Sequence, residues 1–406
     1  MRSLLAGRDV REGMELLDAH GARLGARPRG GAEVLEALDA SGLRGRGGGA
    51  FPVATKWRSV ASGTSRSRAV LINGAEGEPL SRKDHVLMAS RPHLVLDGAA
   101  IAAETLGADD VVIYVGQAHT GARESMRRAL LERPTKERQR TRFVVAPPRY
   151  VAGEESAAVH CVNDGVALPT STPPRPFEHG IAGHPTLVQN VETLAHVAMI
   201  ARFGSDWFHS IGAGAPGTVL LTLSGAVGAA GVVEVPHGAT VAEAVEAAGG
   251  LTETPQAVML GGYFGTWMDA RSAWPLQLDA AAMRAAGATL GCGVVSVLGA
   301  HRCGVLETAR VTSYLADESA RQCGPCVFGL RAIAEAAQRI AAGIAQPNDL
   351  SRARRWATQL GGRGACNHPD GAAAMLLSAL EVFADEFARH DQRRGCSVVR
   401  HAVQAA

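Results

Sequence analysis

The chain has 406 residues, a formal net charge of +2 and a hydrophobic fraction of 46%. This length allows two or three domains with real cores, and the balanced charge argues against a nucleic-acid-binding surface. No apolar run reaches the roughly 18 residues needed to cross a bilayer, and the N-terminus resembles neither a signal nor a transit peptide. The seven cysteines are an odd number without an export signal, so we expect a cytoplasmic protein with thiols or metal ligands rather than disulfides.

The first part of the chain alternates apolar runs with helical patterns. Residues 68–75 and 109–116 read as buried strands, and residues 93–107 read as the helix between them. This alternation is typical of a mostly parallel sheet covered by helices. We therefore predict an N-terminal extension over residues 1–30 and an α/β domain over residues 31–210.

Two further domains are predicted. Residues 217–250 offer two short strands, a glycine-rich turn and a helix capped by Thr240, which indicates a small α+β module over residues 211–300. Helical periodicity dominates from about residue 303 and predicts a helical domain over residues 301–406. We expect one apolar stripe of Val327, Leu330, Ile333 and Ile340 and another of Leu376, Leu380, Phe383 and Phe387.

A glycine-rich segment, "GLRGRGGGAFPVATKW" at residues 42–57, is the strongest chemical signal in the first domain. Glycines let the backbone approach a ligand, and consecutive amides can form a nest for phosphate oxygens, with Lys56 adding a positive charge. The spacing matches neither a P-loop nor a strand-preceded G-x-G-x-x-G. A phosphate site and a flexible turn are equally compatible with this pattern.

Two acidic segments follow. "NGAEGEP" at residues 73–79 comes directly after a predicted strand, where carboxylates are often functional but surface turns are common. "YVAGEESA" at residues 150–157 carries the adjacent Glu154 and Glu155 after a glycine. A solvated helix start is the simpler explanation there, because Glu is favoured in a first turn.

The segment "ESARQCGPC" at residues 318–326 ends in a C-x-x-C step, a spacing that can hold a metal or an iron–sulfur cluster. Ala320 stands where another thiol would complete a C-x-x-C-x-x-C run. An iron–sulfur cluster, a zinc ion and no metal all remain open from these residues alone. Cys161, in "SAAVHCV", reads as a buried core thiol.

Together these segments resemble, in order and spacing, the flavin-bearing, NADH-oxidising (F-type) subunit of respiratory complex I and its relatives in NAD-reducing hydrogenases and formate dehydrogenases. The resemblance runs from about Gly42 to Asp385 and includes "GHPTLVQNVETLA" at residues 183–195. The middle module is similar to the family's β-grasp (SLBB-like) insertion. The last helices resemble its four-helix-type bundle that holds an iron–sulfur cluster.

The resemblance implies FMN held without a Rossmann fold, with its phosphate near the glycine-rich loop and Lys56. Carboxylates and an aromatic or basic side chain would face the nicotinamide dinucleotide, NAD(H) or NADP(H); the candidates are Glu78, Glu155, Phe51 and Arg175. The residues that match the family's cofactor site are Gly45, Arg46, Gly47, Gly48, Lys56, Asn73, Glu76, Gly153, Glu154, Glu155, Asn190 and Thr193.

Several residues depart from the family pattern. Ala75 replaces an Asp, Leu80 replaces a Gly, and Gln189 replaces the first of two asparagines. Ser59 and Arg175 occupy positions that align with Phe. Arg175 can stack on adenine or pair with a 2′-phosphate, which would favour NADPH, or it can be a surface residue.

For the cluster, Cys323, Cys326 and Cys366 match three of the family's four ligands, so the resemblance implies a [4Fe–4S] cluster with an incomplete cysteine set. A fourth ligand can be another thiol, a histidine or a carboxylate; the candidates are His368, Asp317, Glu318, Cys303, Cys292 and Cys396. Zinc held by the three cysteines and His368 is an alternative.

The implied function is an electron-transfer flavoprotein subunit that oxidises NADH or NADPH and delivers electrons to a ferredoxin-like partner or another redox subunit, such as a quinone reductase complex. Peripheral association with a membrane complex fits this function. The alternative is a catalytically degenerate assembly or docking scaffold, with zinc as a stabilising ion.

Overall fold

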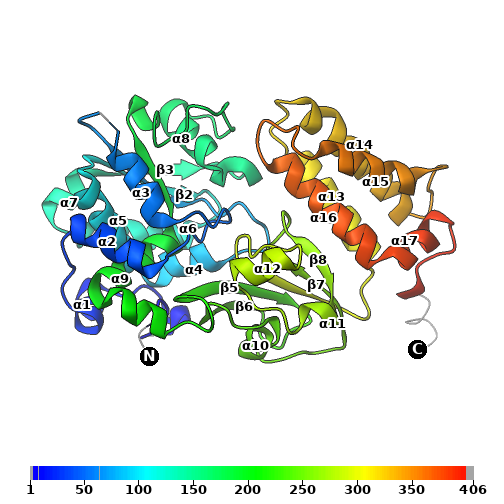
Figure 1. The fold of residues 1–406 in the computed structure, drawn as a ribbon, viewed down its shortest axis with the longest axis horizontal. Coiled ribbons are helices and arrows are strands. Elements are labelled where there is room, and N and C mark those ends of the chain that lie inside the picture. The colour runs from blue at the N-terminus through cyan, green and yellow to red at the C-terminus, as the bar shows by residue number, and fades with distance from the viewer. Residues whose placement is uncertain (1–2, 8, 64, 399–406) are drawn as a thin grey trace. The chain divides into compact units, whose positions relative to one another are not determined.

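The computed structural model describes residues 3–7, 9–63 and 65–398, which form two compact units (Figure 1). The first unit holds the residues up to Gly77, Ser81–Leu221 and Glu234–Ala239. The second holds Glu78–Leu80, Thr222–Val233 and the residues from Thr240 onward. The chain therefore passes between the units several times, and strands β5 and β6 contain residues of both.

The first unit is built around a sheet of four parallel strands in the order β3-β2-β1-β4. Strand β1 lies in the middle and pairs Ile72 with Ile113 of β2 and with Gln189 of β4. Parallel strands covered on both faces need long apolar runs, which β1 and β2 supply. The strands are β1 (Ala69–Gly74), β2 (Asp110–Gly116), β3 (Thr141–Ala146) and β4 (Thr186–Asn190).

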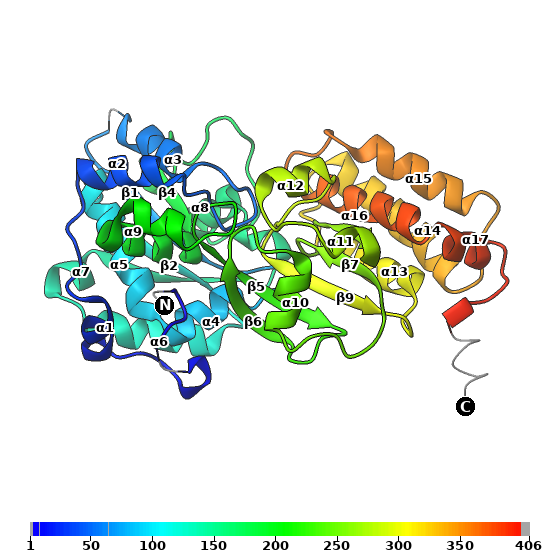
Figure 2. The same cartoon turned by 60° about the horizontal axis from the view of Figure 1, so that its bottom comes forward.

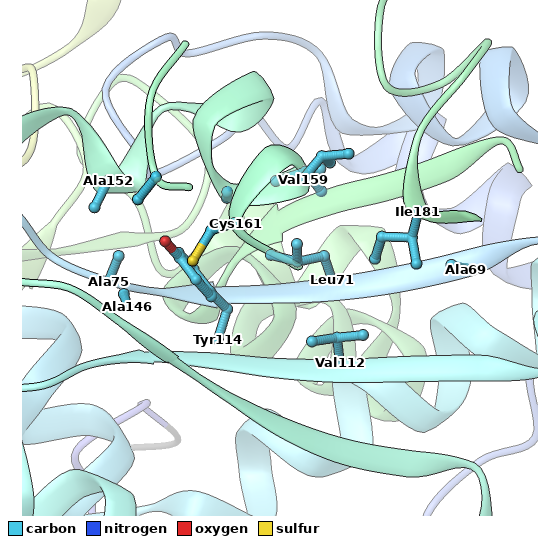
Figure 3. Packing of buried hydrophobic residues seen from close by; sticks show 13 residues of the cluster. Ala69, Leu71, Ala75, Val112, Tyr114, Ala146, Ala152, Val159, Cys161 and Ile181 are labelled. Atoms are coloured by element: carbon cyan, nitrogen blue, oxygen red, sulfur yellow. The ribbon is translucent and has the colours of Figure 1, made fainter. Parts of the chain in front are cut away.

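Alternate side chains of the central strands pack on opposite faces of this sheet. On one face, Leu71, Val112 and Tyr114 form a buried cluster with Cys161 of helix α8 (Figure 3). Cys161 is 7% exposed, which confirms the predicted core thiol. The other face is covered by α5, which packs against β1 and β2.

Helices surround the sheet of the first unit, as Figures 1 and 2 show. The residues predicted as an N-terminal extension contain α1, whose His20 Nε2 lies 2.8 Å from Asp97 Oδ2 on α5. The helices are η1 (Val10–Glu12), α1 (Leu17–Leu24), α2 (Ala32–Ser41), α3 (Val53–Ala61), α4 (Lys83–Ser90), α5 (Pro92–Leu106), α6 (Thr120–Leu131), α7 (Thr135–Gln139), η2 (Tyr150–Gly153), α8 (Glu155–Asp164), η3 (Ile181–Gly183) and α9 (Val191–Ser210).

The second sheet has five strands in the order β6-β5-β9-β7-β8, with β5 and β9 parallel and β7 antiparallel to both of its neighbours. The predicted cap at Thr240 is present at the start of α10, where Thr240 and Glu243 form a reciprocal capping box. The elements are β5 (Thr218–Gly225), β6 (Gly231–Pro236), α10 (Val241–Ala247), β7 (Pro255–Leu260), β8 (Thr266–Asp269), α11 (Ala270–Ala273), α12 (Ala280–Ala285) and β9 (Val294–Gly299).

The remaining residues of the second unit form helices, one of which, α16, packs against strand β8. The predicted apolar stripes are buried, except that Val327 is 42% exposed. Val327 lies in η4, a π-helical turn, where the wider winding shifts side chains away from α-helical positions. The helices are α13 (Gly304–Asp317), η4 (Pro325–Leu330), α14 (Arg331–Ala341), α15 (Asp349–Leu360), α16 (His368–Val382) and α17 (Ala384–Asp391).

The two strands and the helix predicted from the apolar pattern of the first domain are present as β1, β2 and α5, with ends within one residue of the predicted positions. Within residues 3–7, 9–63 and 65–398, no helix is both long and apolar enough to cross a membrane.

Candidate functional site

The glycine-rich loop presents three open backbone amides. The Gly45 amide donates to the Phe51 carbonyl at 2.9 Å and closes the loop ahead of α3. The amides of Gly47, Gly48 and Gly49 make no hydrogen bond within the described residues, and all three glycines are exposed. Gly48 has φ 103°, a conformation that favours glycine. Consecutive free amides of this kind suit an anion.

Asn190 and Thr193 seat this loop at the start of α9. The Asn190 side-chain oxygen caps the helix by accepting from the amides of Glu192 (2.9 Å) and Thr193 (3.4 Å). The Arg46 amide donates to Thr193 Oγ1 at 2.9 Å, and a Cβ on Gly47 would lie 3.2 Å from Asn190 Cβ. The open amides therefore lie close to a helix N-terminus at the carboxyl edge of a parallel sheet, a position that favours anionic ligands.

Lys56 and Glu155 form an ion pair between α3 and α8. Lys56 Nζ lies 2.6 Å from Glu155 Oε2, and the two side chains are 22% and 28% exposed. Glu154 has a different task, because its Oε2 accepts from the amides of Ser156 and Ala157 at 3.0 Å each and caps α8. The helix-start interpretation therefore holds for both residues, because Glu154 caps α8 and Glu155 is its first residue; Glu155 also pairs with the only lysine of the glycine-rich segment.

Asn73 and Glu76 organise the chain after β1. Asn73 Nδ2 donates to the Gly153 carbonyl at 2.8 Å and joins the end of the strand to η2. The Glu76 carboxylate accepts from the amides of Asp84 (2.9 Å) and His85 (2.8 Å) at the start of α4. Burial and the neighbouring Asp84 raise the pKa of Glu76 to about 7.

The Arg46 side chain points into the protein rather than toward the open amides. It is 8% exposed and its Nε lies 4.0 Å from Glu192 Oε1. Glu192 also pairs with Lys83, whose Nζ lies 2.8 Å from Oε2 and 2.7 Å from Asp84 Oδ1. Burial would raise the pKa of Glu192, but Lys83 lowers it to about 2. We did not predict this buried network; charged residues inside apolar helical segments were its only sequence signal.

Two of the substituted positions face the interior. Ala75 is 6% exposed, and Gln189, at 4%, accepts from Trp57 Nε1 at 3.3 Å. The side-chain amide of Gln189 therefore already has a partner, Trp57, and lies one residue before the helix cap at Asn190. Leu80 belongs to the second unit, where its amide donates to Glu78 Oε1 at 3.2 Å.

The four nicotinamide candidates lie in different surroundings. Phe51 is 54% exposed beside the loop, and Arg175 is exposed with its amide bound to Glu178 Oε2 at 2.9 Å. Glu155 pairs with Lys56. Glu78 belongs to the second unit, is 7% exposed and accepts from the Tyr263 amide at 2.8 Å.

The second unit brings Cys323, Cys326 and Cys366 together beside η4. Burial opposes ionisation of Cys323, but hydrogen bonds from the backbone of Ala365 and Cys326 and from the Cys326 thiol lower its pKa. Burial, Cys323 and Cys366 raise the pKa of Cys326 to about 12. Three neighbouring thiols with hydrogen bonds to sulfur suit an iron–sulfur cluster, whose ligands are commonly stabilised in this way.

Several candidates for a fourth ligand have other partners or positions in the structure. His368 Nε2 donates to the Leu315 carbonyl at 2.7 Å, so this nitrogen is already used. Cys292 Sγ donates to the Gly261 carbonyl at 3.4 Å. Cys303 precedes the first residue of α13, a helix of 14 residues and therefore about 21 Å long, and Cys323 follows its other end.

Comparisons with known proteins identify the domains to which these residues belong. The family model of the Nuo51 FMN-binding domain matches residues 38–199, that of the SLBB domain matches 220–262, and that of the NADH-ubiquinone oxidoreductase-F iron–sulfur binding region matches 307–390. The second F-type NADH-quinone oxidoreductase subunit of Rhizobium meliloti is 32% identical over 378 residues, covering 90% of each chain. The NADP-reducing hydrogenase subunit HndC of Solidesulfovibrio fructosivorans is 27% identical and covers 90% of this chain and 77% of its own.

A solved structure is also similar. The NAD⁺-reducing [NiFe]-hydrogenase in its air-oxidised state superimposes with a TM-score of 0.78 at 30% identity. The match covers 89% of this chain and 62% of the hydrogenase chain, so this chain spans less than two thirds of that protein's length. The chain belongs to the family of F-type subunits of NADH-quinone oxidoreductases, oxidoreductases that combine an FMN-binding domain with an iron–sulfur-binding region.

Proposed function

We propose that this chain is the dinucleotide-oxidising subunit of a redox complex, with the FMN phosphate at the Gly47–Gly49 amides and an iron–sulfur cluster at Cys323, Cys326 and Cys366. One observation carries the proposal: the three open amides of Gly47, Gly48 and Gly49 follow Arg46, whose own amide is hydrogen-bonded to Thr193 at the start of α9. When bound, FMN supplies hydride acceptance and single-electron release, and the cluster supplies an outlet for single electrons.

The residues around the loop have distinct tasks in this proposal. Lys56 contributes a positive charge toward the phosphate, and Glu155 keeps that ammonium group in place by the 2.6 Å ion pair. Asn190 and Thr193 hold the loop in its binding conformation. The hydrogen bond from Asn73 to the Gly153 carbonyl holds the backbone of η2 close to the end of β1.

The second sheet supports the cluster-holding helices. We infer that it is a β-grasp module, which the SLBB match at residues 220–262 supports. A chain with one set of three clustered cysteines needs a further redox subunit to accept its electrons, and we propose a ferredoxin-like partner. No disulfide joins any of the seven cysteines within the described residues, which supports a cytoplasmic location, with peripheral attachment to a membrane complex through partner subunits.

The flavin site is tested by Gly47→Val and Lys56→Ala. A valine at Gly47 would press on Asn190 and displace the open amides, so FMN retention should fall more than tenfold; Lys56→Ala removes one charge and should weaken retention less. Equilibrium dialysis with FMN measures both. Gly21→Val, where an added Cβ meets nothing within 4 Å, and Lys136→Ala are the matched controls. A wild-type chain that binds no FMN favours the scaffold alternative.

Coenzyme preference is tested at Arg175. If its guanidinium pairs with a 2′-phosphate, NADPH should reduce the bound flavin faster than NADH, and Arg175→Phe should reverse this order. Stopped-flow absorbance of flavin reduction measures both rates. Arg140→Phe serves as a control at another position of the first unit. Identical preferences in the wild type and Arg175→Phe would make Arg175 a surface residue.

A further inference from the structure

A second group of metal-ligating side chains lies in the second unit, apart from Cys323, Cys326 and Cys366. Cys303 directly precedes α13, Glu386 and His390 are one turn apart on α17, and Cys396 follows that helix. One ligand atom from each of the four residues lies within 4.8 Å of all the others. Cys303 and His390 are buried, at 7% and 4% exposed. Cys303 and Cys396 lie outside the residues 307–390 that match the iron–sulfur-binding family.

The spacing between these atoms fits a tetrahedral zinc ion. Zinc–ligand bonds of about 2.3 Å to sulfur and about 2.0–2.2 Å to nitrogen and oxygen place sulfur and nitrogen about 3.6 Å apart, and nitrogen and oxygen about 3.3–3.4 Å apart. Cys303 Sγ lies 3.6 Å from His390 Nε2, and Glu386 Oε1 lies 3.3 Å from the same nitrogen.

The surroundings of His390 select the nitrogen that would bind a metal. His390 Nδ1 faces the Ala341 carbonyl at 3.3 Å, and because a carbonyl can only accept, a proton on Nδ1 leaves the lone pair of Nε2 for a metal. The lone pair of Nε2 then faces the Glu386 carboxylate, and two acceptors at this distance repel each other unless a proton or a metal cation lies between them. A backbone carbonyl behind the ligating histidine is a common outer partner in metal sites.

The carboxylate and the chain end are positioned as well. Glu386 Oε1 accepts from the Ser397 amide at 2.9 Å, and Oε2 accepts from the Ser397 hydroxyl. Two thiolates, one carboxylate and a divalent ion carry one net negative charge, which Arg389 offsets with its Nε 3.9 Å from Glu386 Oε2. These contacts hold the segment around Cys396 against α17.

We propose that Cys303, Glu386, His390 and Cys396 bind one Zn²⁺ ion that fastens the C-terminal segment and α17 to the start of α13. Four protein ligands close the coordination sphere, which is typical of structural rather than catalytic zinc. The site is also distinct from the proposed iron–sulfur site, because the length of α13 separates Cys303 from Cys323.

Metal analysis of the full chain, purified under argon without added metal, tests this site. Wild type should contain about one zinc per chain. Cys303→Ser/Cys396→Ser should lose it and keep its iron, whereas Cys323→Ser/Cys366→Ser should lose iron and keep zinc. Cys161→Ser, a change at a core thiol of the other unit, should keep both. The flavin content should be the same in all four proteins. The zinc result is therefore independent of flavin binding and of the proposed redox function.

A second measurement covers the case in which the double variant does not fold. Chelator-treated Cys323→Ser/Cys366→Ser is titrated with Co²⁺, which should give the visible absorbance of a tetrahedral thiolate site, and His390→Gln in the same background should abolish that absorbance. Three results would overturn the proposal: zinc that follows Cys323 and Cys366, a wild-type chain that takes up neither zinc nor cobalt, or a Cys303–Cys396 disulfide in the protein isolated under argon.

Discussion

Replacement of Asp97 by asparagine should lower the free energy of unfolding of the first unit by about 3–5 kcal/mol. Asp97 is 1% exposed on α5 and accepts from His20 Nε2 at 2.8 Å, from Arg133 Nη2 at 2.5 Å and from Arg202 Nη2. Asparagine keeps the shape but leaves two buried guanidinium groups and His20 facing a neutral amide. Because removing one partner from a buried ion network is far costlier than removing a surface pair, this change should be among the most destabilising in the chain.

Thermal unfolding of the wild type, Asp97→Asn and Asp39→Asn measures this effect. Asp39 pairs with Arg58 at 3.0 Å, but both side chains are at least half exposed, so solvent screens the pair and its replacement should leave Tm almost unchanged. For a unit of this size the Asp97 loss corresponds to a fall in Tm of roughly 6–20 °C. Equal Tm values for the two variants would show that the Asp97 network contributes little.

The same network predicts a pH dependence. Burial would raise the pKa of Asp97, but His20, Arg133 and Arg202 lower it well below its usual range. A carboxylate with a depressed folded-state pKa stabilises the protein above its unfolded-state pKa of about 3.9 and loses that contribution as the pH falls. Wild type should therefore lose stability steeply below about pH 4, and Asp97→Asn should lose less over the same range. Parallel curves would contradict this assignment.

Restoring a thiol at Ala320 should change the chemistry of the cluster site. Ala320 is 9% exposed and lies three residues before Cys323, where a thiol would complete a C-x-x-C-x-x-C run. A cluster held by three thiolates has one weakly bound iron, so mild oxidation of the wild type should convert part of it to a [3Fe–4S] form. Ala320→Cys should suppress that conversion and, because it adds negative charge near the cluster, lower the reduction potential.

Electron paramagnetic resonance before and after oxidation, with a redox titration of both proteins, measures the two effects. Ala285→Cys places an extra thiol on an exposed position of α12 and should leave the spectrum and the potential unchanged. If reconstituted wild type shows no iron–sulfur signal in either redox state, the three cysteines hold no cluster. Zinc bound at Cys323 and Cys366 without iron would support the alternative of a structural ion there.

Local patterns of the sequence determined the secondary structure of the sheet and the identity of the motifs. Apolar runs of strand length predicted β1 and β2, helical periodicity predicted α5, and a threonine directly before a helical pattern predicted the capped start of α10. These features depend on neighbouring residues and on burial, which a linear pattern records directly. Motif order also indicated the family, which the comparisons confirmed.

Only the tertiary structure decided which charged and sulfur-containing side chains meet. Lys56 pairs with Glu155, 99 residues away, and Arg46 turns inward to Glu192 although its neighbouring glycines leave their amides open. Cys303, read as a candidate for the cluster, instead lies beside His390 on α17. The helix α13, about 21 Å long, lies between Cys303 and Cys323, which are only 20 positions apart in the sequence. Residues that are far apart in the sequence meet where their helices and strands pack together. Side-chain partners therefore follow from the packing of elements rather than from spacing in the sequence.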